Sequence, residues 1–165
     1  MADCTKKTPR WLLMALVVGM ALCGVDGGWA NEPDAWKQLF TDGVKAREAA
    51  HYAEAEQLLQ RALREAEQAG PDDARVATAA NNLGLLYHDQ GRLQEAQSLY
   101  TRALAKWEQP LGPEHEDVAA ALNNLAEIAH AEGEWGRAEP LYERVLAIER
   151  KVLGAAHPDV AISLH

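Results

Sequence analysis

An internal repeat constrains this chain more than any other feature of its sequence. Residues 117–153 read as two amphipathic helices joined by a turn that contains glycine, and residues 75–111 show the same pattern. When residues 76–117 are aligned with residues 118–159, 18 of the 42 pairs are identical. A fixed period of this size is typical of stacked helical repeats. The identical pairs include Asn81/Asn123, Asn82/Asn124, Leu83/Leu125, His88/His130, Gly91/Gly133, Ala96/Ala138 and Tyr100/Tyr142.

The same pattern extends toward both ends of the chain. In the first copy, which is one position shorter, Ala55 corresponds to Ala96, and near the C-terminus His157 restarts the pattern of His115. No segment shows the sustained alternation of β-branched residues that favours a strand. The predicted helix pairs occupy about residues 33–70, 72–112 and 114–154, and half of a fourth pair occupies residues 156–165.

Single residues indicate how the pairs pack and where one helix ends. Small residues at positions such as Gly84 and Ala126 should let the two helices of a pair approach closely. Tyr100 and Tyr142 should fill the space between helix pairs. Neighbouring helix pairs must stack, because a single helix pair cannot bury its apolar stripe. Proline lacks a backbone donor, so we expect Pro110 to end its helix near Gln109.

Residues 1–30 have the three-part layout of a secretory signal peptide. A basic start is followed by an apolar run at residues 11–23 and by Gly28-Trp29-Ala30, which offers small residues for cleavage. The run is shorter than the about 20 apolar residues that a membrane-spanning helix needs. We therefore expect export to the periplasm or outside the cell. A retained membrane anchor is the alternative, and Leu22 before Cys23 argues against a lipoprotein site.

The leader also holds both cysteines, Cys4 and Cys23, so its removal would leave no thiol for a disulfide or a cysteine metal site. The net charge is −9, and it becomes about −10 without the leader, which carries three basic and two acidic residues. A negative field repels phosphate backbones and anionic lipid surfaces. We therefore expect no nucleic-acid partner. We expect contact with a membrane only if the leader is not cleaved.

Position for position, the repeat resembles the tetratricopeptide repeat in its 42-residue form, as found in kinesin light chains. The residues that carry the resemblance in the middle copy are residues 83–87 (LGLLY), Gly91, Ala96, Tyr100 and Ala103, and the next copy carries Leu125, Ala126, Gly133, Ala138, Tyr142 and Val145. The resemblance implies an all-α fold over residues 31–165. This fold is a right-handed α-solenoid of antiparallel helix pairs, with three repeats plus half of a fourth.

The paired asparagines are the best candidates for a binding site. Asparagine inside a helix costs about 0.6 kcal/mol relative to alanine unless its amide finds a partner. In the resembled family, asparagine at these first-helix positions reaches into a groove and bonds the backbone of an extended peptide. Helical spacing places four further residues on the same face. The predicted groove consists of Asn81, Asn82, Leu85, His88, Asn123, Asn124, Glu127 and His130.

Two alternatives to a peptide-binding role stay open for these residues. Asn81 and Asn123 could bond each other or neighbouring turns and so stabilise the stack, or they could recur through duplication alone. His88 and His130 should stand about 10 Å apart on adjacent helices, too far for a bridging metal. His115 and His157 belong to the connectors, where helix capping is the expected role.

The chain shows no enzyme motif, so we expect no catalytic residue, metal or cofactor. The expected function is that of an exported scaffold or adaptor that binds a protein or peptide in its concave groove. The acidic charge favours a basic partner. One alternative is a structural module that forms homodimers through the half-repeat at residues 156–165. Another is that the sequence is the N-terminal part of a longer array.

Overall fold

The computed structural model describes residues 35–70 and 74–153 of the chain, and these residues form helices and short turns. The predicted signal peptide (1–30) and the predicted half-repeat (156–165) lie outside the described residues. The helices are α2 (Ala35–Glu48), α3 (Tyr52–Ala69), α4 (Ala74–Asp89), α5 (Leu93–Leu111), α6 (Glu116–Ala131) and α7 (Trp135–Leu153).

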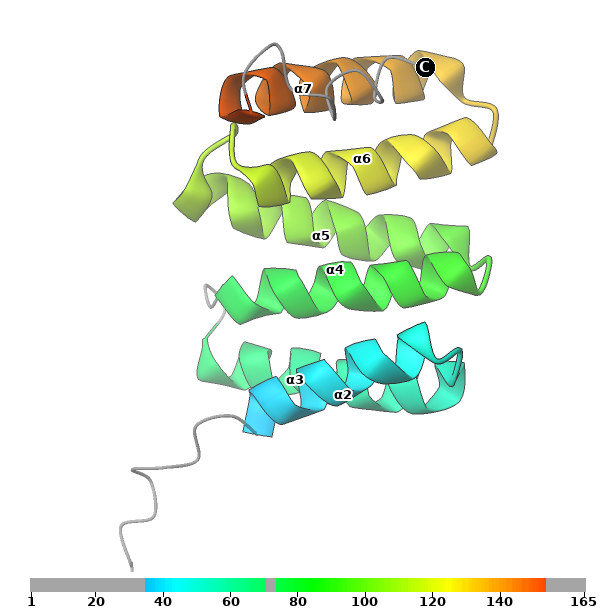
Figure 1. The fold of residues 1–165 in the computed structure, drawn as a ribbon, viewed down its shortest axis with the longest axis vertical. Helices are drawn as coiled ribbons and strands as arrows, with labels where there is room; N and C mark the ends of the chain where they lie inside the picture. Colours follow the sequence, from blue (N-terminus) through cyan, green and yellow to red (C-terminus); the bar gives the residue numbers. More distant parts are fainter. Residues whose placement is uncertain (1–34, 71–73, 154–165) are drawn as a thin grey trace, which may run out of the picture. The chain divides into compact units, whose positions relative to one another are not determined.

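Each helix packs mainly against its neighbours in sequence (Figure 1). Helices α2 and α3, α4 and α5, and α6 and α7 form three antiparallel pairs, and α3 packs on α4 as α5 packs on α6. This arrangement confirms the predicted all-α solenoid of stacked helix pairs.

Every pair turns at the same place in its repeat, through a residue with a positive φ angle. These residues are Ala50 (φ 58°), Gly91 (φ 74°) and Gly133 (φ 75°). The residue that follows each of them donates its N–H to a carbonyl five residues back, at 2.8 Å in all three turns. Glycine adopts this left-handed conformation without steric cost, whereas Ala50 bears a Cβ there.

The second helix of the middle pair is longer than the sequence predicted. Pro110 lies inside α5, which continues to Leu111 instead of ending near Gln109. The prediction was wrong because Pro110 stands in the last turn, where its missing donor removes only one bond. The N–H of Gly112 still donates to the carbonyl of Glu108 at 3.1 Å and closes the helix.

The core runs through the stack as a continuous layer of small and aliphatic side chains. The predicted small residues Ala96, Ala126 and Ala138 are at most 2% exposed. The ring of Tyr100 is 1% exposed and lies against Gly84 of its own pair. Tyr100 therefore fills space within its own pair. The sequence predicted a role for Tyr100 between pairs and did not predict this contact. Gly84 makes room for an aromatic ring that a larger residue would exclude.

We predict that Gly84→Ala destabilises the fold by about 1–3 kcal/mol, the usual cost of overpacking a filled core. A Cβ at this position would stand 2.7 Å from Cε1 of Tyr100. Gly136→Ala is the matched control, because a Cβ there meets nothing within 4 Å. That control should be neutral or gain up to about 1 kcal/mol from helix propensity. Urea unfolding of both variants tests the prediction, and equal stabilities would contradict it.

Candidate peptide-binding face

An amide pair joins the first helices of the second and third helix pairs. The Nδ2 group of Asn124 on α6 donates to Oδ1 of Asn81 on α4 at 3.0 Å. Asn81 is only 9% exposed, the one buried polar residue among those that the structure describes. A buried amide oxygen without a donor would cost about 1–3 kcal/mol, so this bond stabilises the stack.

The other two asparagines bond within their own helices. The amide of Asn82 donates to the carbonyl of Thr78 at 2.9 Å. The amide of Asn123, which is partly exposed, donates to Oε1 of the exposed Glu127, also at 2.9 Å. The pairing across repeats therefore runs from Asn81 to Asn124, and the direct bond between Asn81 and Asn123 that we weighed from the sequence is not formed. Asn124 and Asn81 therefore stabilise the stacking of the helix pairs, whereas Asn123 stays accessible to solvent.

The remaining predicted residues divide in the same way between the two helices. Leu85 and His88 on α4 are half-buried, whereas Glu127 and His130 on α6 are exposed. The ring of His130 meets the ring of Trp135 edge to face, with 4.5 Å between centroids. Trp135 is 61% exposed and was not predicted as a site residue, although an aromatic residue opening a helix beside a turn was a visible signal. We use the name α6 face for Asn123, Glu127 and His130 of α6 together with Trp135, the first residue of α7.

The carboxylate of Glu127 sets the local electrostatics. Burial raises the pKa of Tyr100, and the negative charges of Glu127 and Asp89 raise it further against the opposing effect of Arg47. Burial and Glu127 likewise raise the pKa of Tyr142. Both phenols therefore stay protonated at neutral pH. Glu127 exerts its negative field on tyrosines of two successive repeats.

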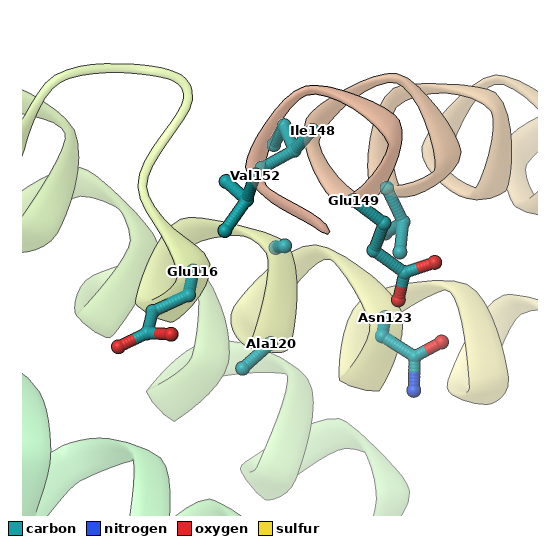
Figure 2. Close-up of a pocket in the computed structure, with 8 residues that line it drawn as sticks. Glu116, Ala120, Asn123, Ile148, Glu149 and Val152 are labelled. Atoms are coloured by element: carbon teal, nitrogen blue, oxygen red, sulfur yellow. The ribbon is translucent and has the colours of Figure 1, made fainter. Parts of the chain in front are cut away.

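A pocket of about 320 Å³ opens beside Asn123, between α6 and α7 (Figure 2). Its walls are largely aliphatic, and the amide of Asn123 and the carboxylate of Glu149 lie at the same side of it. Of the eight predicted groove residues, Asn123 alone lines this pocket. The lining residues are Glu116, Ala119, Ala120, Asn123, Val145, Ile148, Glu149 and Val152.

Over residues 35–70 and 74–153, no three histidine, cysteine or acidic side chains are grouped so that they could hold a metal ion. No described helix is long and apolar enough to cross a membrane. The side chain of His115 caps α6 by accepting the N–H of Asp117 at 3.2 Å, which confirms its predicted role. His157 lies outside the described residues.

A family model for the tetratricopeptide repeat matches residues 46–109 and 117–165. The chain belongs to the tetratricopeptide repeat family. Proteins of this family generally mediate protein–protein interactions, and their fold is typically a non-catalytic scaffold. A search of curated proteins found no match.

Solved structures place this tetratricopeptide repeat protein with the kinesin-light-chain type. BtubC (BKLC) from P. vanneervenii is 26% identical, with a TM-score of 0.67 over 77% of this chain and 50% of that chain. A point variant of kinesin light chain TPR-like repeats from Podosopora anserina is 25% identical, with a TM-score of 0.69 over 81% of this chain and 63% of that one. The chain thus spans between half and two thirds of these relatives' lengths.

We predict opposite effects for two neighbouring asparagines. Asn124→Ala should lower the free energy of unfolding by about 1 kcal/mol or more, because it leaves the buried Oδ1 of Asn81 without its donor. Asn123→Ala removes only an exposed bond and should leave stability unchanged or slightly raised. Thermal and urea unfolding of both variants measure the difference. Equal losses in the two variants would refute a structural role for the amide pair.

Proposed function

We propose that this tetratricopeptide repeat protein is an exported scaffold that binds a peptide or protein partner along α4 and α6. The α6 face contributes most to binding, because its polar groups reach solvent and Asn123 keeps capacity for further hydrogen bonds. Its amide uses one N–H on Glu127, which leaves the second N–H and the oxygen for a peptide backbone. The partial exposure of Asn123 beside the pocket is the observation that carries the proposal.

The partner is basic, on the grounds of charge. The chain carries a net charge of −9, and Glu127 places an exposed carboxylate on the α6 face. Beside it, Trp135 offers a large exposed ring on which an aliphatic or cationic side chain can pack. Leu85 and His88 on α4 add a half-buried surface for further contacts. The proposed role is binding without catalysis.

A second candidate is an assembly role at the C-terminal end of the described stack. Val152 is 53% exposed beside the pocket, although its neighbour Ile148 is only 3% exposed. This end therefore offers apolar surface to another helix. A helix from a second copy of the chain could cover it, and so could a helix that continues the array.

The binding proposal is tested with a random peptide library displayed against the full chain. Selected peptides should be rich in Lys and Arg, and their affinity should fall as salt rises. Asn123→Ala should weaken binding about three- to tenfold, the effect of one hydrogen bond, without lowering stability. Glu127→Gln should weaken binding of basic peptides in particular. Selection of acidic peptides, or binding indifferent to both changes, would refute the proposal.

The export proposal is tested by the intact mass of the protein made in a bacterial host with its leader. We expect a soluble product that begins at Asn31, because the basic start, apolar run and small residues before this position fit signal peptidase. Ala30→Leu should block cleavage, since a bulky side chain does not fit the position before the cut. A full-length mass in the soluble cytoplasmic fraction would exclude export.

A further inference from the structure

The α6 face continues past Asn123 into the pocket between α6 and α7. Four residues of α6 follow one another at spacings of three or four and so lie on one side of the helix: Glu116, Ala120, Asn123 and Glu127. Glu127 belongs to the α6 face, whereas the other three line the pocket. A peptide whose backbone bonds Asn123 therefore has a side chain beside the pocket.

The pocket combines a packed floor with an open aliphatic rim. Val145 and Ile148 are each 3% exposed, so the floor is already closed by the packing of α6 against α7. Ala120 and Val152 are exposed at the rim. A ligand that covers this rim removes aliphatic surface from water and displaces none of the packed floor. The part of the pocket open to a ligand is therefore apolar.

Carboxylates border this apolar surface at both ends. Figure 2 shows Glu116 at one end of the pocket and Glu149, together with Asn123, at the other. None of the described residues that line the pocket is basic. Long basic side chains place their methylene groups on apolar surface and keep the charged group in a polar environment. An aliphatic rim between carboxylates is complementary to such a side chain.

Lysine fits this pocket better than arginine. A lysine side chain has four methylene groups and a compact ammonium group, whereas the guanidinium of arginine stacks best on aromatic rings. No aromatic residue is among the described residues that line the pocket. Building on the proposed function, we propose that the pocket takes a lysine side chain of the bound peptide, with its methylene groups on Ala120 and Val152 and its ammonium group at Glu116.

The dimensions of α6 agree with this placement. Glu116 precedes Asn123 by seven residues, which is about 10 Å along a helix that rises about 1.5 Å per residue. An extended lysine side chain spans about 6 Å from its Cα to its Nζ, since it contains five bonds. The side chain of Glu116 bridges the remainder. A peptide backbone at Asn123 can therefore bring a lysine ammonium group to the Glu116 carboxylate.

Two synthetic peptides and two matched variants of the full chain test the inference. The peptides are four repeats of Lys-Gly-Ala and four repeats of Arg-Gly-Ala, and fluorescence anisotropy gives the affinity of each. Ala120→Leu fills the rim, so it should lower the ratio of lysine-peptide to arginine-peptide affinity about three- to fivefold, the effect of one buried methylene group. Ala147→Leu is the control, because Ala147 is exposed on α7 outside the pocket, and it should leave the ratio unchanged.

A third peptide tests the role of the charge. Norleucine in place of every lysine keeps the aliphatic stem and removes the ammonium group. Glu116→Gln should weaken binding of the lysine peptide about two- to fivefold, because it removes an exposed charge partner, and should leave binding of the norleucine peptide unchanged. Equal effects of Glu116→Gln on the two peptides would overturn the placement of the ammonium group.

Failure of this inference is distinguishable from failure of the proposed function. Asn123→Ala should weaken the lysine and arginine peptides alike, because both use their backbone at Asn123. If it does so while Ala120→Leu leaves the affinity ratio unchanged, the lysine pocket is refuted and the proposed binding along α6 stands. If neither basic peptide binds the unmodified chain, both proposals are refuted.

Discussion

Within the described stack, the first two helix pairs each carry an apolar face that the following pair covers. Where the following pair is present, the covering residues are excluded from water, as Val118 and Leu122 of α6 show with 0% and 1% exposure. At the end of the described stack, a pocket of about 320 Å³ with largely aliphatic walls stays open between α6 and α7. Stability in such an array is a sum of terms within repeats and terms between neighbours. The state of the terminal interface therefore affects the last repeat far more than the first.

Two kinds of polar contact connect the repeats, and they differ in how much they stabilise the fold. The bond from Asn124 to Asn81 is largely buried, so it favours one register and penalises any arrangement that leaves the amide unpaired. Arg102 pairs with Glu67, and one repeat later Arg144 pairs with Glu108. The side chains of these two ion pairs are 35–41% exposed, and pairs of this kind contribute about 0–1 kcal/mol each. These two ion pairs therefore add little stability. The buried amide pair therefore does more than the ion pairs to fix how successive repeats join.

The fold was predictable from sequence because the period, the turns and the small residues agree with one another. The site was less so, because spacing places a residue on a face without showing its hydrogen-bond partner. Asn123 and Asn124 are adjacent in sequence, and only the relative rotation of α4 and α6 decides that Asn124 reaches Asn81. The effect of Pro110 was predicted wrongly for a similar reason. The cost of its missing N–H donor depends on how close Pro110 lies to the end of α5. The contact of Trp135 with His130 was not predicted because it depends on how α7 packs against α6.

The equivalence of Asn81 and Asn123 couples ligand binding to the length of the stack. Asn81 is buried because a following first helix supplies the amide of Asn124. A first helix seated on α6 with a donor at the corresponding position would bond the oxygen of Asn123 in the same way. Asn123 would then become a structural residue, and the exposed polar face would move to the newly added helix. Peptide binding at Asn123 and the seating of a further first helix on α6 would therefore compete for one amide.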